Sequence, residues 1–220
     1  GLDAGGAVPD DVAERQARRD RDSGVLLIRD AGSPADTRWM DERADLPRII
    51  RAGRHIARTR RYTRNYAWEL EPDQLVGVVE QEARHGNGWV KLVGDWIERD
   101  HGDLQPCWPL PELTAAIAAA HRLGARVTAH VFGEDALPDL LEARIDCIEH
   151  GSGLSPDLME VMAARDVAVV PTLVNIDNFP TFAAQGEAKF PAYAKHMRAL
   201  HARRYETIGL AREAGVPVYA

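Results

Sequence analysis

Residues 126–150 read RVTAHVFGEDALPDLLEARIDCIEH, and this stretch decides the fold class. Arg126–His130 is an apolar run of strand length, and Ile145–Glu149 is a second one. Between them, Ala136–Ala143 has the apolar spacing of a helix. A strand, a helix and a strand in so short a unit predict two parallel strands joined by a helical crossover.

The same alternation continues on both sides of this unit and predicts an α/β fold. Further strands are predicted at Gly24–Ile28, Arg48–Ala52, Trp89–Val93, Val167–Val170 and, as the beginning of one more, Val216–Tyr219. Helices are predicted at Asp10–Ser23, Asp73–Arg84, Pro111–Leu123, Ser155–Ala164 (with Ser155 as N-cap) and Tyr193–Ala214. Parallel strands covered by helices on both faces read as near-continuous apolar runs, and Gly24–Ile28 is such a run.

Seven predicted strands in 220 residues favour a TIM (β/α)8 barrel. An open doubly wound sheet is the alternative, but it needs a Gly-rich phosphate turn, and Asp30–Pro34 is a poor one. We therefore expect residues 1–220 to form a single barrel domain that lacks the first strand and the end of the last. The chain opens with Gly1 and not with Met, as a piece of a longer protein would.

Composition limits the partners of the chain. Its 27 basic and 34 acidic residues give a net charge of −7, which argues against bulk nucleic-acid binding. The longest apolar run, Ala115–Ala120, is too short for a membrane helix, and no signal peptide is recognisable. Because Cys107 and Cys147 are the only cysteines, a reducing cytoplasm fits best. We expect a small-molecule substrate, no nucleic acid and no membrane, and the sequence leaves a homo-oligomer open.

Three polar residues lie in or at the ends of runs that should otherwise be apolar. Lys91 lies inside Trp89–Val93, and His130 and His150 end successive strands. A lysine in a strand buried on both faces must be neutralised or paired. The carboxyl ends of barrel strands are where active sites collect, so two neutral imidazoles there could converge on a metal. The alternatives are hydrogen-bonded core histidines, and a lysine that pairs with Asp30 or Glu149.

The other six histidines are interpreted as surface or packing residues. His55, His85 and His101 lie in predicted loops or at helix ends, and His121 lies on a predicted helix. His196 and His201 are five residues apart, which does not place two ligands on one helix face.

Five segments resemble motifs of the amidohydrolase superfamily, most closely its imidazolonepropionase-like and prolidase-like (Xaa-Pro dipeptidase-like) branch. They are Gly24–Gly32, Trp89–Val93, Val127–Gly133, Ile145–Gly151 and Val169–Leu173. The resemblance runs in order through most of the chain, from about residue 20 to residue 219. The Ile-Glu-His-Gly element with the downstream Val-Pro-Thr-Leu is its most distinctive part.

The resemblance implies a TIM barrel with one or two divalent metal ions, usually zinc, at its mouth. Lys91 matches the fourth-strand lysine that binuclear members use as a bridging carbamate. His130 and His150 match the fifth- and sixth-strand histidines on the second metal. Carboxylation would turn a cationic ammonium into an anionic ligand and would remove the buried positive charge.

Two pieces of the superfamily pattern are missing from the sequence. The His-x-His pair that follows the first strand does not occur, and the final-strand aspartate would come just after Ala220. Because both omissions fall at the chain ends, we expect a trimmed fragment that holds at most half of a binuclear site.

Substrate contacts are predicted at Arg61, Trp96 and Phe132. Residues 43–64 hold eight arginines, which form either a solvated face or, through Arg58, Arg60, Arg61 or Arg64, a grip on a substrate carboxylate. Trp68, Trp96 and Trp108 fall in predicted loops, where they could line a pocket or pack a lid. Relatives often have Tyr or His at the position of Phe132, so substrate recognition here must differ.

The leading hypothesis is a metal-dependent hydrolase of C–N bonds in a dipeptide or N-acyl amino acid, with metal-bound hydroxide as the nucleophile. Lys91, His130 and His150 would be both the metal ligands and the catalytic residues. One alternative is a mononuclear deaminase or cyclic-amide hydrolase on the same fold, in which Lys91 is structural. Another is a non-catalytic binding protein derived from a barrel.

Overall fold

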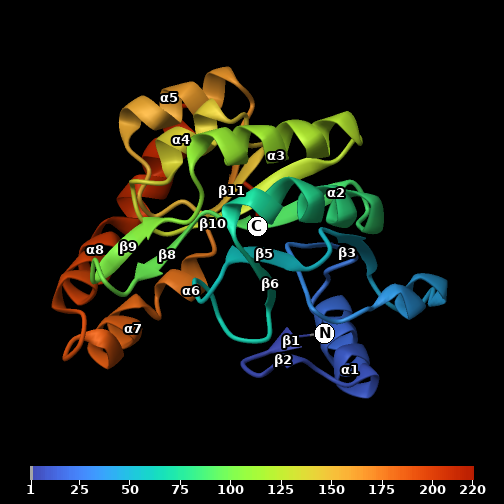
Figure 1. Cartoon of the computed structure of the whole chain (residues 1–220). Coiled ribbons are helices and arrows are strands. Elements are labelled where there is room, and N and C mark those ends of the chain that lie inside the picture. The colour runs from blue at the N-terminus through green and yellow to red at the C-terminus, as the bar shows by residue number, and fades with distance from the viewer. Residues whose placement is uncertain (1) are drawn as a thin grey trace.

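The computed structural model describes residues 2–220 and is built around a six-stranded, fully parallel sheet (Figure 1). The spatial order of its strands is β12 (Ala168–Val170), β11 (Cys147–His150), β10 (Arg126–Val131), β7 (Trp89–Val93), β5 (His55–Arg58) and β6 (Ala67–Leu70). Within the described residues the sheet is open, since β12 and β6 are its two ends. A single parallel bridge, Val169 to Val218, extends it beyond β12.

A second layer of helices covers the sheet. The helices α2 (Leu75–His85), α3 (Leu110–Arg122), α4 (Leu137–Glu142) and α5 (Pro156–Ala164) follow one another along the same side in Figure 1. The short 3-10 helix η2 (Pro72–Gln74) leads into α2. Leu75, Val79 and Ile117 from these helices share one buried cluster with Val90 and Val127 from the strands. This contact is the main core of the molecule.

A second cluster lies at the carboxyl ends of the strands. It joins the hairpin β8 (Asp95–Glu98) and β9 (Asp103–Pro106) to α6 (Leu173–Ile176), α7 (Phe179–Gly186) and α8 (Pro191–Glu213). Phe132, Phe179 and Met197 are among its buried residues. The hairpin and these helices therefore form walls above the strand ends.

An ionic cluster fixes α8 to the β8–β9 hairpin and to the segment after β10. His196 lies between two carboxylates, with Nδ1 at 3.0 Å from Asp103 and Nε2 at 2.7 Å from Glu134. Arg203, two helical turns further on, also pairs with Glu134. The cluster joins α8 to β9 and to the segment that follows β10.

The N-terminal part forms a smaller unit beside the sheet (Figure 1). Its elements are β1 (Leu2–Asp3), β2 (Gly6–Ala7), α1 (Asp10–Asp22), β3 (Leu27–Asp30), the 3-10 helix η1 (Arg38–Glu42) and β4 (Arg48–Arg51). The strands β3 and β4 are parallel and pair with each other. Ala13, Ala17, Met40 and Leu46 form a separate small core here.

Most predicted elements are confirmed, with small shifts at their ends. The predicted strand Trp89–Val93 has the observed bounds, and the strand–helix–strand unit of residues 126–150 is present as β10, α4 and β11. The α/β class and the parallel sheet are thus confirmed, whereas closure into a barrel remains a prediction. Ser155 occupies the N-cap of α5, but its side chain makes no capping hydrogen bond.

Three details of the prediction are wrong. The run Gly24–Ile28 is not buried on both faces: the strand begins only at Leu27, and Leu26 and Leu27 are 71% and 57% exposed. The strands β5 and β6 lie in a region that the sequence analysis left without strands, and Trp68 lies on β6. Trp96 likewise lies on a strand, β8, and not in a loop.

Candidate functional site

The polar residues singled out in the sequence lie on three neighbouring strands of the sheet. Lys91 on β7 is in register with Thr128 on β10, and His130 on β10 is in register with Glu149 on β11. All four side chains are buried, with exposed fractions of 4% or less. The strand order therefore brings Lys91, His130 and His150 to one region of the sheet, as the sequence predicts.

The two histidines meet directly. Nδ1 of His130 lies 2.9 Å from Nε2 of His150, and Nδ1 of His150 lies 2.6 Å from the hydroxyl of Thr172. Glu149 is in register with His130 and shares its face of the sheet. Because side chains alternate along a strand, a regular strand would place the next residue, His150, on the other face. The left-handed backbone of His150, with φ of +73°, ends the extended conformation, and the ring meets His130.

Thr172, which anchors His150, also has a left-handed backbone, with φ of +46°. Neither residue is glycine, and such conformations are unfavourable for residues with a Cβ. Backbone strain of this kind is often found at functional sites. His150 and Thr172, which follow neighbouring strands, are thus two residues with unfavourable backbone conformations joined by one hydrogen bond.

Burial favours the neutral form of both imidazoles. Burial lowers the pKa of His130 well below its usual range, and the nearby His150 and Lys91 lower it further. Burial likewise lowers the pKa of His150 to about 3. A neutral imidazole keeps the lone pair that metal coordination requires.

Lys91 lies in a mixed electrostatic environment. Burial lowers the pKa of its ammonium to about 8, although the carboxylate of Glu149 acts in the opposite direction. Glu149 also accepts hydrogen bonds from Arg29 at 2.8 Å and from the hydroxyl of Thr128 at 2.6 Å. Burial acts to raise the pKa of Glu149, but Lys91 and Arg29 outweigh it and lower this pKa overall. Glu149, and not Asp30, is thus the carboxylate that acts on Lys91.

His55 was interpreted from the sequence as a surface or packing residue, and the structure places it beside Lys91. It lies on β5, is 6% exposed, and its Nδ1 has no hydrogen-bond partner among the described residues. Gly32, with φ of +114°, lets the chain pass close by: a Cβ there would lie 2.9 Å from the His55 ring and 3.0 Å from Cγ of Lys91. The short apolar run Ile56-Ala57 was the only signal for this strand.

Asp95 is a second residue that the sequence analysis missed. Its buried carboxylate accepts the backbone N–H groups of Phe132 and Gly133, at 2.9 and 2.6 Å, and lies 3.7 Å from Nε2 of His130. Burial raises the pKa of Asp95 to about 6, against the effect of the two N–H donors. The signal available was an aspartate directly after the strand, in Val93-Gly94-Asp95.

Two imidazoles fit half of a divalent-metal site. Two nitrogens bound to one tetrahedral zinc ion lie about 3.3 Å apart, close to the 2.9 Å between His130 and His150. Nε2 of His130 is buried and has no hydrogen-bond partner in residues 2–220, and it faces the carboxylate of Asp95. A carboxylate behind a metal-bound histidine is a common supporting arrangement. Over the same residues no group of three or more His, Cys, Asp or Glu is placed to hold a metal.

Two of the three predicted substrate contacts line a cavity of about 600 Å³ above the histidines. Trp96 and Phe132 contribute to its wall, together with His130 and His150. Arg61 does not line this cavity. Its guanidinium is buried and donates to the carbonyls of Trp96 and Gln105, at 2.9 and 2.7 Å. Arg61 thus supports the β8–β9 hairpin, and a role in substrate binding stays a prediction.

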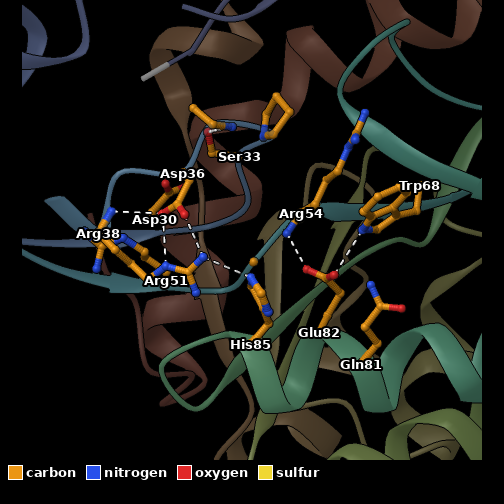
Figure 2. A pocket seen from close by; sticks show the side chains of 13 residues that line it. Asp30, Ser33, Asp36, Arg38, Arg51, Arg54, Trp68, Gln81, Glu82 and His85 are labelled. Atoms are coloured by element: carbon orange, nitrogen blue, oxygen red, sulfur yellow. Dashed lines mark hydrogen bonds and ion pairs between the residues drawn. The ribbon is translucent and has the colours of Figure 1, made fainter. Parts of the chain in front are cut away.

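The arginine-rich segment does not form a single solvated face. Arg51 is buried and donates to the hydroxyl and the carbonyl of Thr37, and Arg54 stacks over Trp68 at 4.5 Å. These two arginines line a cavity of about 330 Å³, shown in Figure 2, that shares no residue with the cavity above the histidines. Glu82 there accepts hydrogen bonds from the Arg54 backbone and from the Trp68 indole (Figure 2). The polar groups of this second cavity are largely paired with one another.

No helix among residues 2–220 combines the length and the apolar character that crossing a membrane requires. The two cysteines, Cys107 and Cys147, are buried and form no disulfide.

Comparison with known proteins places this geometry in context. No family model matches the chain. Uncharacterized proteins from Mycobacterium bovis and Mycobacterium tuberculosis are 57% identical over 221 residues, which is all of this chain and 60% of each relative. The chain thus spans about three-fifths of the length of these relatives.

Solved structures resemble the chain over nearly its whole length. A Xaa-Pro dipeptidase with bound methionine matches 95% of it with a TM-score of 0.74 and 21% identity, over 57% of that protein. A putative prolidase from Bifidobacterium longum matches 95% with a TM-score of 0.77 and 20% identity, over 54% of that protein. An amidohydrolase matches 96% with a TM-score of 0.69 and 19% identity, over 58% of that protein. The chain therefore has the fold that these prolidase and amidohydrolase structures share.

Proposed function

We propose that the chain is part of a metal-dependent hydrolase of the amidohydrolase superfamily, from its prolidase-like branch. The reaction is hydrolysis of a C–N bond, in an amide or peptide, in a small substrate. The fold likeness and the order of Lys91, His130 and His150 along three neighbouring strands support this proposal. A cytoplasmic location goes with it, because both cysteines are free and buried.

The observation that carries the proposal is the convergence of His130 and His150. Their facing nitrogens lie 2.9 Å apart, burial favours the neutral form of both rings, and the second ring is fixed by Thr172. The left-handed backbones of His150 and Thr172 place the second ring against the first. These two rings would hold a divalent cation, most simply zinc.

A divalent cation held there would lower the pKa of a water molecule and polarise the substrate carbonyl. The protein groups contribute position and exclusion of water. Thr172 fixes the ring of His150, and Asp95 lies behind His130 and binds the backbone that places Phe132 in the cavity wall. Phe132 and Trp96 would hold the substrate against the two rings.

Lys91 would supply a third ligand, an anionic one, after carboxylation. A pKa of about 8 leaves a usable fraction of neutral amine at neutral pH. The amine nitrogen would attack the carbon of CO2 and release one proton, which converts a buried cation into a carbamate anion. With this ligand the site would hold two ions, and without it one.

A mononuclear deaminase or cyclic-amide hydrolase is the second candidate. It is favoured by Glu149, whose carboxylate stabilises the charged form of Lys91 and so opposes carboxylation. In that case Lys91 would act as a structural cation between Glu149 and the sheet.

Metal content tests the proposal. The natural full-length protein, purified without chelator, should contain about two divalent ions per chain by elemental analysis, or about one if Lys91 is structural. Substitution His130→Asn or His150→Asn should lower this content and abolish amide hydrolysis. His121→Asn, at an exposed position on α3, is the matched control and should change neither.

Three outcomes would contradict parts of this proposal. A folded full-length protein that binds no added zinc would favour a non-catalytic binding protein. Metal content that survives loss of both histidines would place the ion elsewhere. Unchanged metal content and activity in Lys91→Ala would refute the carbamate and would favour the mononuclear enzyme, in which Lys91 is structural.

A further inference from the structure

The cavity above the histidines has a composition that limits what it can bind. Its floor is formed by His130, Phe132 and His150, at the ends of β10 and β11. Its walls come from residues 62–66, from β8, from α6 and α7 and from the start of α8. The cavity is a half-open cleft with a volume of about 600 Å³, which is enough to admit a small organic molecule.

The wall is predominantly aromatic. The ring of Tyr62 lies 4.9 Å from that of Trp96, in an edge-to-face arrangement, and the rings of Trp96 and Phe132 are stacked at 6.4 Å. Phe132 in turn contacts the ring of His150 at 4.7 Å. Aromatic walls favour flat or bulky apolar ligands, since such rings stack and bury apolar area against them.

The lining also lacks charge. None of the described residues that line this cavity is Asp, Glu, Lys or Arg. Arg61, which directly precedes the lining residue Tyr62, instead donates hydrogen bonds to the carbonyls of Trp96 and Gln105. The polar groups on offer are neutral: the phenols, the hydroxyl of Thr63 and the amides of Asn175 and Gln185.

A ligand carboxylate held against the aromatic floor of this half-open cleft would have no counter-ion among the described lining residues. Burying an ionised carboxylate without a counter-ion is strongly unfavourable. A divalent cation held by the two histidines would polarise the amide that is cleaved, and a carboxylate elsewhere on the same substrate would need a partner that the described lining does not supply. Neutral groups can instead form hydrogen bonds with the amides and phenols of the wall.

We propose that this cavity binds uncharged aromatic amides, and not the anionic dipeptides or N-acyl amino acids that the sequence suggests. The inference rests on the proposed function for the reaction at the histidines, but its ligand class comes from the cavity alone. Phe132 and Trp96 would contact the aromatic group, and Asn175 or Gln185 a neutral polar substituent.

A matched pair of probes tests the proposal. N-Benzoylpyrrolidine and N-benzoyl-L-proline contain the same aromatic amide and differ only in the carboxylate. Binding of each to the purified full-length protein is followed by quenching of tryptophan fluorescence, because Trp96 lies in the wall, and hydrolysis by release of benzoate. We expect the neutral amide to bind at least about tenfold more tightly.

The two readouts separate this inference from the proposed function. Neutral amide bound but not hydrolysed would support the ligand class and contradict the hydrolase. Equal or tighter binding of the acid, or binding of neither probe, would overturn the ligand class even if amides of another kind were cleaved.

A variant with an added cation provides a second test. Gln185 is exposed on α7 and lines the cavity, so Gln185→Arg should place a guanidinium in the wall with little effect on folding. It should shift the binding ratio of the two probes at least about fivefold toward the acid. Gln185→Met, of similar length and without charge, is the control and should not shift it. An unchanged ratio in the arginine variant would mean that carboxylates are excluded for another reason, and the proposal would fail.

Discussion

The ionic cluster around His196 makes stability depend on pH in a defined direction. The hydrogen bond to Glu134 is the main reason that the pKa of His196 is raised to about 9, with Asp103 adding to it against partial burial. A group whose pKa is higher in the folded state stabilises that state when it is protonated. The contribution is therefore complete below the ordinary value of 6.5 and is lost as the pH rises through about 9.

The size of the effect follows from that difference. At about 1.4 kcal/mol per pH unit, the upper bound is about 3 kcal/mol. The side chain of His196 keeps 22% of its exposure, so water and salt screen the interaction and we expect about 1–2 kcal/mol. The free energy of unfolding in urea, measured at pH 6 and pH 10, should show this loss in the native chain and not in His196→Gln.

The difference between native and variant is the decisive quantity, since it cancels other groups that titrate over the same range. His201→Gln is the matched control. It lies on the same helix, and its Nε2 is 3.8 Å from Asp177, beyond hydrogen-bond distance. A native-minus-variant difference for His196 that is the same at both pH values would refute the reasoning.

Two further predictions concern packing and a buried donor. Gly32→Ala should lower the free energy of unfolding by about 1–3 kcal/mol, because the new Cβ would meet the His55 ring at 2.9 Å and the backbone has φ of +114°. The control is Gly209→Ala, at a helical position with open space around it, which should raise the free energy of unfolding by about 0.5–1 kcal/mol. Similar effects of the two substitutions would contradict the prediction. Trp108→Phe should lower the free energy of unfolding in urea by about 1–2 kcal/mol, because the buried indole donates to the carbonyl of Val93 at 2.8 Å; a neutral result would show that the carbonyl finds another donor.

The part of the site that the sequence predicts consists of polar residues inside apolar runs. Lys91, His130 and His150 stand out because parallel strands leave little room for polar side chains, and strand adjacency then brings them together. Both steps are local: each strand is recognised from a few residues, and neighbouring units along the chain are neighbours in the sheet.

The missed residues depend on contacts between distant parts of the chain. Asp95 accepts hydrogen bonds from N–H groups 37 and 38 residues further on, and its position directly after a predicted strand is the one local signal of this role. The strand of His55 is hidden by its charged neighbours. In the sequence, the charge of Arg54 is typical of a loop. In the structure its guanidinium donates to the carbonyl of Tyr66 and stacks over Trp68, and the strand β5 begins at the next residue.

The strained backbone of His150 and Thr172 has a consequence for ligand binding. Both residues have the left-handed conformation, and their 2.6 Å hydrogen bond holds the imidazole in place. A ligand that binds the two rings therefore meets a preorganised pair and need not supply the free energy that orients them. Binding at these rings should therefore leave the backbone at both strand ends unchanged.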